Sequence, residues 1–514
     1  MYCQVISAAI CGLQARRVMV EADVRTGMPM FSLIGYLSAE VKEAEDRVRT
    51  ALKNSGIELP LAKITVNLAP ADLRKEGSCF DLPIAMAVLA ASGIIEPEKL
   101  SGILFAGELG LDGRLEPVRG VIEMVSKAET FGCSTCIIPC ANLTEGSVLR
   151  KGTVLGARSI REVIDYFTSG KELHKGETDP QHTRQEPGTR SDRDFSMIRG
   201  QEVLKRAAEV AVAGGHNLLI IGPPGSGKTL TAQCIATILP KTSMEEAIEI
   251  TRIHSIAGTL PPDTGLMTGR PFRAPHHTIT PSGLAGGGHN PRPGEISLAH
   301  RGILFADEIP EFRQDTLEIL RQPLEDKKIT ISRLFGNFTF PADFQLIASA
   351  NPCKCGYYPD RKRCRCTPYE IKRYLNHISQ PLLDRIDMCV EAGEISFEEI
   401  TGTAGPDGDS SAVIRERVEA VRRIQKERFR NEGCVTNAGM KTEEIEKYCV
   451  LGEDEKNLME KVFHKLQLTG RGYYRLLKVA RTLADMEGKE RICCDHIAEA
   501  VAYRMIDQKY WGSL

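Results

Sequence analysis

The stretch LLIIGPPGSGKT, residues 218–229, decides the fold of the middle of this chain. It opens with a short apolar run, which is typical of a strand buried inside a parallel sheet. A glycine-rich segment follows at once, and LTAQCIATIL (230–239) then has a composition suited to a helix. A strand, a glycine-rich loop and a helix in this order predict a P-loop, in which backbone N–H groups and the positive end of the helix surround a phosphate. We therefore expect an α/β domain that binds a nucleoside triphosphate.

The residues of this loop have expected roles. Lys228 is expected to reach the β- and γ-phosphates, and Thr229 to bind the Mg²⁺ ion that accompanies ATP. A glycine-rich turn that matches by chance would not explain the strand and helix on either side. The predicted ATP-binding residues are Gly222, Pro223, Pro224, Gly225, Ser226, Gly227, Lys228 and Thr229.

Two later apolar runs end in polar residues that suit ATP hydrolysis. The run GILFADE (302–308) ends in Asp307 and Glu308. We expect Asp307 to hold Mg²⁺ and Glu308 to polarise the attacking water, because phosphoryl transfer needs charge neutralisation and an oriented nucleophile. The run FQLIASANP (344–352) ends near Asn351, which is expected to help position that water. Taken alone, Asn351 is better explained as a turn-forming residue before proline.

Length and composition set limits on the class of protein. The 514 residues, 42% hydrophobic and 26% charged, predict about three domains of an ordinary soluble protein. The longest apolar stretches are too short to cross a bilayer, and the N-terminus lacks the pattern of a secretion signal, so we expect a cytoplasmic protein without a membrane partner. The 16 cysteines are then expected to be reduced, with any clustered set reserved for metal, and the net charge of -2 gives no bulk signal for nucleic-acid binding.

Two polar segments divide the chain. Residues 169–195 contain Pro, Gly and charges of both signs with almost no apolar residue, which predicts a linker. A second break at 402–411 precedes a C-terminal third with amphipathic helical periodicity. The predicted domains are 1–168, 196–401 and a helical domain at 412–514, whose basic residues are best explained as solvated helix faces.

Four cysteines cluster directly after the Asn351 strand. They form C-x-C, eight residues and a second C-x-C, namely Cys353, Cys355, Cys364 and Cys366. Four thiolates at this spacing can complete the tetrahedral shell of a structural Zn²⁺, whereas a reduced or redox-labile loop is the alternative. Seven Lys or Arg residues with interleaved tyrosines surround them in 354–373, which suits either nucleic-acid binding or a solvated loop.

Together with QPLLDRID (380–387) and TGRGYYRLLKVARTLADMEG (469–488), these strings resemble the AAA+ ATPases, specifically the magnesium-chelatase-like YifB/ComM family. The resemblance covers essentially the whole chain, and its most specific piece is RPFRAPHHTITPSGLAGGGHNPRPGEISLAHRGILFADE (270–308). It implies a ring, a homo-hexamer with ATP at each subunit junction.

The resemblance also assigns two arginines and a hairpin. Arg385 matches the family's arginine finger and Arg471 its sensor-2 arginine, and the less favoured alternative for Arg385 is a surface salt bridge with Asp384 or Asp387. An inserted hairpin that projects towards the ring's pore is expected around 326–344, whereas its alternation alone would also fit a sheet edge.

The first domain, through residues 106–142, resembles the proteolytic domain of Lon, a fold related to ribosomal protein S5 domain 2. Lon-type proteolysis needs a Ser nucleophile and a Lys base. Alignment of KEGSCFDLPIAMA (75–87) places Asp81 where the serine should be, with Ser78 three residues away, and Ile122 falls at the lysine position. We therefore expect an inactive scaffold or partner-binding domain.

The family resemblance implies an ATP hydrolase that translocates on DNA, a helicase for branch migration of recombination intermediates in natural transformation, with single-stranded or branched DNA as its partner. A second hypothesis is a chelatase-like ATPase that remodels a protein partner, which is disfavoured because that enzyme's motor subunit is expected to lack the Lon-like domain. An ATP-dependent protease is disfavoured because the catalytic Ser and Lys positions hold other residues. A non-enzymatic scaffold is the least favoured, because every expected nucleotide-site residue is present.

Overall fold

The computed structural model describes residues 1–149, 151–176, 184–185, 193–333, 336–394 and 408–512. The chain forms two compact units, and each combines segments that are distant in sequence. The first unit contains residues 1–186, 243–268 and 290–292, and the second contains 187–242, 269–289 and 293–514. Residues 243–268 pack with the N-terminal unit, and the C-terminal helices belong to the nucleotide-binding unit.

The N-terminal unit is built on a mixed eight-stranded sheet in the order β10-β9-β8-β5-β1-β2-β4-β3. The first two strands form a long antiparallel hairpin, and the remaining strands add in both directions. The strand bounds are β1 Tyr2–Cys11, β2 Gln14–Arg25, β3 Met30–Ile34, β4 Lys63–Ala69, β5 Ile103–Phe105, β8 Thr135–Pro139, β9 Thr153–Ala157 and β10 His174–Lys175. Separate pairs are β6 Glu108–Leu109 with β7 Leu115–Glu116, and β11 Arg184–Gln185 with β13 Leu266–Met267.

Helix α3 (Asp81–Ala91) forms the centre of this unit. It is apolar on every side and every one of its residues is buried, as expected of a helix inside a core. It contacts β1 and β2 of the sheet and helix α2. The other helices of the unit are α1 Ala39–Lys42, α2 Ala44–Asn54, α4 Val121–Lys127, α5 Leu143–Ser147, α6 Ile160–Ser169 and α9 Met244–Ala257.

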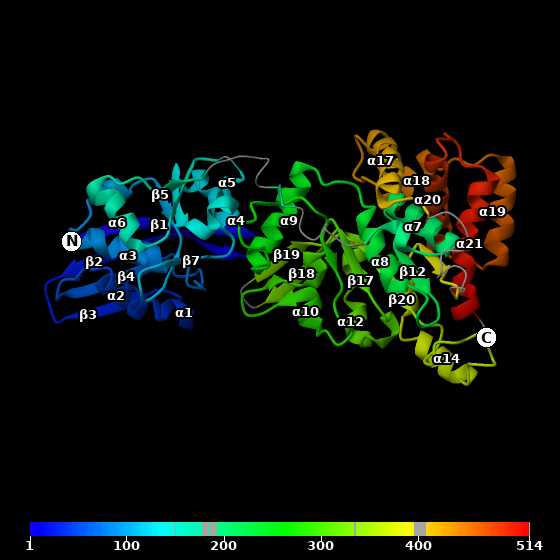
Figure 1. The fold of residues 1–514 in the computed structure, drawn as a ribbon, viewed down its shortest axis with the longest axis horizontal. Helices are drawn as coiled ribbons and strands as arrows, with labels where there is room; N and C mark the ends of the chain where they lie inside the picture. The colour runs from blue at the N-terminus through cyan, green and yellow to red at the C-terminus, as the bar shows by residue number, and fades with distance from the viewer. Residues whose placement is uncertain (150, 177–183, 186–192, 334–335, 395–407, 513–514) are drawn as a thin grey trace. The chain divides into compact units, whose positions relative to one another are not determined.

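The second unit contains a five-stranded parallel sheet in the order β14-β17-β20-β12-β21 (Figure 1). Its three central strands are entirely buried, which explains why they are mostly apolar, with Gln345 and Ser349 of β20 as the exceptions. The strands are β12 Leu218–Ile221, β14 Phe272–Arg273, β17 Ile303–Ala306, β20 Gln345–Ala350 and β21 Met388–Glu391. All strands point the same way, so their carboxyl ends meet along one edge of the sheet.

Helices and a hairpin surround this sheet. They are α7 Glu202–Gly214, α8 Lys228–Thr237, α10 Pro281–Ala285, α11 Glu295–Leu298, α12 Gln314–Glu318, α13 Arg321–Asp326, α14 Pro368–Leu375 and α15 Gln380–Leu383. The short strands β15 (Gly286–Gly287) and β16 (Arg292–Pro293) pair with each other in a separate two-stranded sheet. Strands β18 (Lys328–Arg333) and β19 (Gly336–Pro341) form the expected antiparallel hairpin, with Arg333 at the end of its first strand.

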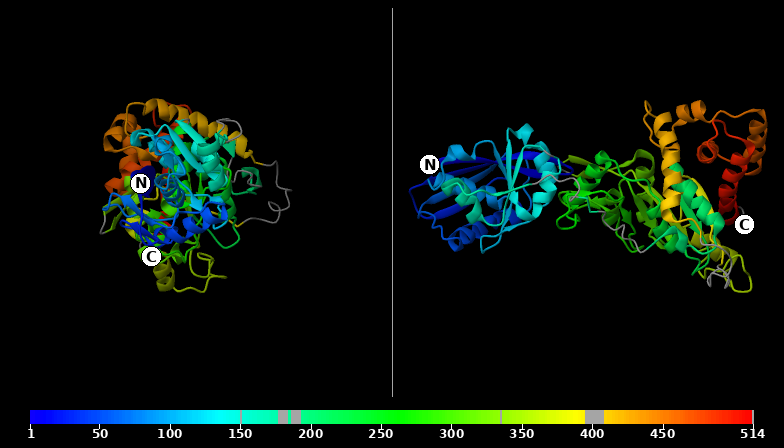
Figure 2. Two further views of the ribbon diagram at one scale, coloured as in Figure 1. Left: turned by 90° about the vertical axis from the view of Figure 1, so that its left-hand side faces the viewer. Right: turned by 45° about the horizontal axis from the view of Figure 1, so that its top comes forward.

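The C-terminal helices share a hydrophobic core with the sheet. Helix α17, the long yellow helix in the right-hand view of Figure 2, contacts α7, and α20 contacts both α7 and α21. They are α17 Ser411–Arg428, α18 Thr442–Tyr448, α19 Glu453–Lys465, α20 Gly470–Met486 and α21 Cys494–Trp511. Mixed α/β architecture with a helical C-terminus is thus confirmed. Within the described residues, no helix is both long enough and apolar enough to span a membrane.

Of the two expected linkers, residues 177–183, 186–192 and 402–407 lie outside the described part of the chain. The rest of the first linker carries more structure than its composition predicts. His174–Lys175 pairs with β9, and Phe195 is buried in the core of the second unit.

Candidate functional site

The P-loop lies where the sequence places it, at the carboxyl edge of the parallel sheet between β12 and α8. Gly222 donates its N–H to the carbonyl of Ala350 at 3.1 Å. A Cβ at Gly222 would lie 2.6 Å from the carbonyl oxygen of Ala392, so only glycine fits here. Gly225 and Gly227 have φ values of +81° and +80°, which side chains disfavour. The loop conformation thus depends on the three glycines.

The Lys228 side chain is held inside this loop. Its Nζ donates to the carbonyls of Gly222 and Pro223, both at 2.8 Å, and to Asn351 Oδ1 at 3.1 Å. Burial lowers the pKa of Lys228, and the negative charges of Asp307 and Glu308 oppose that shift. These hydrogen bonds place a cation beside the backbone N–H groups that would face a phosphate.

The Mg²⁺ ligands expected from the sequence are brought together. Thr229 Oγ donates to Asp307 Oδ2 at 2.9 Å. Two adjacent ligands of an octahedral Mg²⁺ with bonds of about 2.1 Å lie about 3.0 Å apart, so this oxygen pair fits the ion. The Asp307 carboxylate and the Thr229 hydroxyl are also the hard oxygen donors that Mg²⁺ prefers.

Ser349 is a site residue that the sequence argument did not identify. Its buried hydroxyl donates to Asp307 Oδ1 and accepts the backbone N–H of Glu308 at 3.0 Å. It therefore fixes the orientation of both acids, and Glu308 itself has a left-handed φ of 51°. The signal available in the sequence was a serine between the apolar residues LIA and A of β20.

Tyr374 on α14 is a second residue that was missed. Burial raises the pKa of Tyr374, the nearby acids Glu311 and Glu308 raise it further, and a hydrogen bond with Asn351 opposes the shift. Asn351 therefore contacts both Lys228 and a neutral phenol, and this fixes its side-chain amide beside the two acids. A turn-forming role alone would not require these contacts.

The two expected catalytic arginines also lie together, on one carboxylate. Glu325 of α13 contacts Arg385 Nη2 at 2.9 Å and Arg471 Nη1 at 3.3 Å. Arg385 thus pairs with neither of the aspartates that an ordinary local salt bridge would use. Asp384 lies beside Arg475 at 3.6 Å, and Asp387 accepts the backbone N–H of Asn217.

The four clustered cysteines meet in space after β20. Their sulfur atoms all lie within 4.8 Å of one another. The Cys353 sulfur is 3.3 Å from that of Cys355 and 3.7 Å from that of Cys364. Zn–S bonds of about 2.3 Å in a tetrahedron place sulfurs about 3.8 Å apart, so the donor set fits Zn²⁺.

Two of the arginines in the cysteine loop, Arg361 and Arg363, already contact other groups of the same loop. The Arg361 guanidinium lies 5.1 Å from the Tyr358 ring and that of Arg363 lies 4.8 Å from the Tyr357 ring. Arg361 also donates to the Cys366 carbonyl at 2.8 Å. These contacts favour a structural role for part of the basic loop over a purely nucleic-acid-binding role.

The position of the Lon serine is occupied by a structural ion pair. Asp81 is fully buried and accepts two hydrogen bonds from Arg47, at 2.8 and 2.9 Å, and one from the backbone N–H of Leu109 at 3.1 Å. Ile122 is buried in α4. The nearby Ser78 hydroxyl donates to Glu108, and the buried Lys75 donates to the Pro70 carbonyl. Neither residue is arranged as a Ser–Lys pair.

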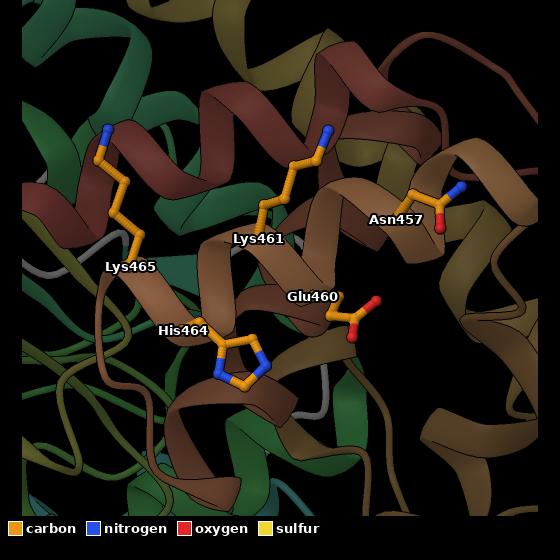
Figure 3. A pocket seen from close by; sticks show the side chains of 5 residues that line it. All are labelled: Asn457, Glu460, Lys461, His464 and Lys465. Carbon is orange, nitrogen blue, oxygen red and sulfur yellow. The ribbon is translucent and has the colours of Figure 1, made fainter.

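A surface hollow lies over helix α19, lined by Asn457, Glu460, Lys461, His464 and Lys465. All five residues come from this one helix, and their side chains spread apart instead of converging (Figure 3). The hollow therefore lacks the convergent polar groups of a binding site.

Family comparisons cover most of the chain. A model for "Magnesium chelatase, subunit ChlI" matches residues 194–400, and its C-terminal counterpart matches 408–504. A model for "Subunit ChlI of Mg-chelatase" matches residues 20–142.

Individual relatives match from end to end. "Competence protein ComM" of Haemophilus influenzae is 41% identical over 97% of both chains. "Uncharacterized protein YifB" of Salmonella typhimurium is 42% identical over 97% of this chain and 96% of its own. "Lon protease 2" of Bacillus subtilis is 26% identical over 34% of this chain. With whole-length identity at this level and the assembled P-loop, Asp307 and Asn351, the chain belongs to the magnesium-chelatase-like YifB/ComM family of AAA+ ATPases.

Proposed function

We propose that this AAA+ ATPase works as a ring-shaped motor that hydrolyses ATP to move along DNA, with branch migration of recombination intermediates as its task. The observation that carries the DNA assignment is the 41% identity to a competence protein over 97% of both chains. The exposed hairpin β18–β19, with Lys328 and Arg333 on its surface, is where we place contacts to DNA phosphates. Such contacts are independent of sequence, as a translocase requires.

The chemical step follows from the site geometry. Lys228 would leave its carbonyl partners for the β- and γ-phosphate oxygens, and Thr229 with Asp307 would hold Mg²⁺. The bound ion supplies neutralisation of the charge on the transferring phosphoryl group. Glu308 would accept the proton of the attacking water, and Asn351 would orient that water through its fixed amide. Ser349 would keep the two acids in their separate roles.

Assembly into a hexamer supplies the remaining charge. Arg385 and Arg471 contact Glu325, and none of their described polar contacts is with the P-loop. We therefore place them against the nucleotide of a neighbouring subunit, where Arg385 acts as the arginine finger. Arginine fingers contribute about 10³–10⁵ in rate where they have been measured.

The cysteine cluster is proposed to hold one structural Zn²⁺. The support is the fit between the observed sulfur separations and a tetrahedral S₄ shell. Hydrogen bonds from the Tyr357 backbone and the other thiols outweigh burial and lower the pKa of Cys355 to about 7, so one thiolate is available near neutral pH.

A chelatase-like ATPase that remodels a protein partner is the second candidate. It is favoured by the family models, all three of which carry the name of the ChlI subunit. The two candidates share the ATPase chemistry and differ only in what stimulates it.

The deciding experiment is steady-state ATP hydrolysis with and without single-stranded or forked DNA, with Glu308→Gln as the inactive control. We expect DNA to raise the hydrolysis rate of the wild-type protein and to have no effect on the variant. Basal hydrolysis that no DNA substrate stimulates, and that a partner protein does stimulate, would reject the DNA motor in favour of the chelatase-like function.

A further inference from the structure

The cysteine loop contacts the P-loop directly. Gly356, between the two C-x-C pairs, has a φ of +87°. A Cβ placed on it would lie 2.5 Å from Cδ and 2.9 Å from Cγ of Pro224. The backbone of the cysteine loop therefore packs against the P-loop with no room for a methyl group.

The same loop is fastened on its other side to the C-terminal end of the unit. Arg363 bridges Asp360 and Glu394, just beyond β21. The Tyr358 ring meets the Tyr510 ring of α21 edge-on at 6.2 Å. Helix α14, which follows the loop, packs against α21 (Figure 1).

The end of α21 is anchored in turn. Tyr510 and Lys509 both donate to Glu391 of β21, at 2.5 and 2.6 Å. Trp511 Nε1 donates to the Leu375 carbonyl of α14 at 3.1 Å. The cysteine loop and strand β21 therefore both connect the last helix of the unit to the nucleotide site.

These segments line a half-open pocket of about 380 Å³ beside the start of the P-loop. Its walls are the P-loop start at Gly222 and Pro223, the cysteine loop at 356–360, the end of β21 and the end of α21. Side chains do not fill this space, so close packing does not hold the cysteine loop on that side. The internal order of the loop then helps to keep it against Pro224, and the four sulfurs, which lie within 4.8 Å of one another, contribute to that order together with the hydrogen bond from Arg361 to the Cys366 carbonyl.

We propose that the metal centre at Cys353, Cys355, Cys364 and Cys366 positions the P-loop, so that metal occupancy sets the affinity for ATP. This inference rests on the proposed Zn²⁺ site and goes beyond it, because a metal that only stabilises its own loop would leave nucleotide affinity unchanged. The four cysteines are positioning residues, and none of them acts on ATP.

The test uses the full-length protein, with zinc content measured by mass spectrometry and nucleotide binding by titration of a fluorescent ATP analogue. Cys366→Ser should lose zinc and bind the analogue about tenfold more weakly, the order expected when a binding group is displaced by a fraction of an ångström. Gly356→Ala keeps all four thiols, so it should retain zinc and still weaken binding about tenfold, because its methyl group pushes the loop away from Pro224.

Gly488→Ala is the matched control. Gly488 also has a positive φ, of +67°, but a Cβ there would meet nothing within 4 Å. This variant carries similar backbone strain without the steric contact, and it should keep both zinc and affinity. Should Cys366→Ser fail to fold, chelator titration of the wild-type protein and Gly356→Ala decide the question.

The outcomes separate the two levels of the proposal. Wild-type protein without stoichiometric zinc would reject the metal site and this inference with it. A zinc-bearing wild-type protein whose affinity stays within twofold after chelation, or a Gly356→Ala variant with wild-type affinity, would reject only the link to the P-loop. Zinc loss together with weakened binding, in both the variant and the chelated protein, would support it.

Discussion

Removal of the Ser349 hydroxyl should slow ATP hydrolysis without preventing nucleotide binding. In Ser349→Ala, Asp307 Oδ1 and the Glu308 backbone N–H each lose a buried partner. A hydrogen bond to a charged group contributes about 1.5–3 kcal/mol and a neutral one about 0.5–1.5 kcal/mol. If about 2 kcal/mol of this is lost in the transition state, kcat falls about 30-fold, since about 1.4 kcal/mol corresponds to a factor of ten.

The assay is steady-state ATP hydrolysis over a range of ATP and Mg²⁺ concentrations, with the free energy of unfolding measured in parallel by urea titration. Ser297→Ala is the matched control, because Ser297 is equally buried and its hydroxyl has no hydrogen-bond partner among the described residues. We expect that control to keep wild-type kcat. A kcat for Ser349→Ala within twofold of that of Ser297→Ala would refute the role given to Ser349.

Three further predictions address other parts of the chain. Arg385→Ala should lower ATP turnover about 10³-fold or more while nucleotide affinity is retained. The control is Arg161→Ala, which removes an exposed ion pair. Equal turnover in the two variants would show that Arg385 only forms a structural salt bridge. Asp81→Asn should lower the free energy of unfolding by about 3–5 kcal/mol in urea titration, because it removes the buried carboxylate of the pair and leaves Arg47 only the exposed Glu43 at 3.7 Å; a loss no larger than that of the exposed Asp46→Asn would contradict this. Cleavage at a protease site inserted at 186–192 should leave the two fragments co-eluting in gel filtration, because residues 243–268 stay covalently in the second fragment and pack in the first unit; separation at low micromolar concentration would show that this packing is weak.

The nucleotide site could be predicted from sequence because its residues lie at the ends of apolar strands. In a parallel sheet those ends meet at one edge, so GPPGSGKT, Asp307 and Asn351 had to converge once the strands were identified. Ser349 and Tyr374 could not be found in this way. Ser349 is one polar residue inside a buried strand, and Tyr374 reaches Asn351 only because α14 folds back after the cysteine loop.

The arginine pair shows a different limit. Arg385 and Arg471 are 86 residues apart by their numbering, and they were assigned from family resemblance alone. Their shared partner Glu325 belongs to no recognisable motif, and an exposed glutamate in a short helix does not by itself indicate an ion pair. Long-range ion pairs of this kind depend on tertiary packing, which local periodicity does not encode.

Helix α9 packs with the N-terminal unit although it follows the P-loop helix in sequence, and its buried contacts explain why. Sequence composition marks a boundary where the chain becomes polar, whereas compact units are defined by buried contacts. Ser255 of α9 donates to the buried Glu145 and accepts the backbone N–H of Gly120 at 3.0 Å. Glu145 also accepts the N–H of Ile122 at 2.9 Å.

An ion pair adds to this contact, since Arg252 of α9 lies 3.3 Å from the buried Glu123. Burial raises the pKa of Glu145, and the hydrogen bond from Ser255 is the largest effect that opposes this rise. Removal of the Ser255 hydroxyl would therefore leave the buried Glu145 carboxyl with one hydrogen bond fewer. Helix α9 thus stabilises the N-terminal unit on which it packs. The segment that follows the P-loop helix in sequence is thus a structural part of the Lon-like unit, and the polar linker is only one of the covalent connections between the two units.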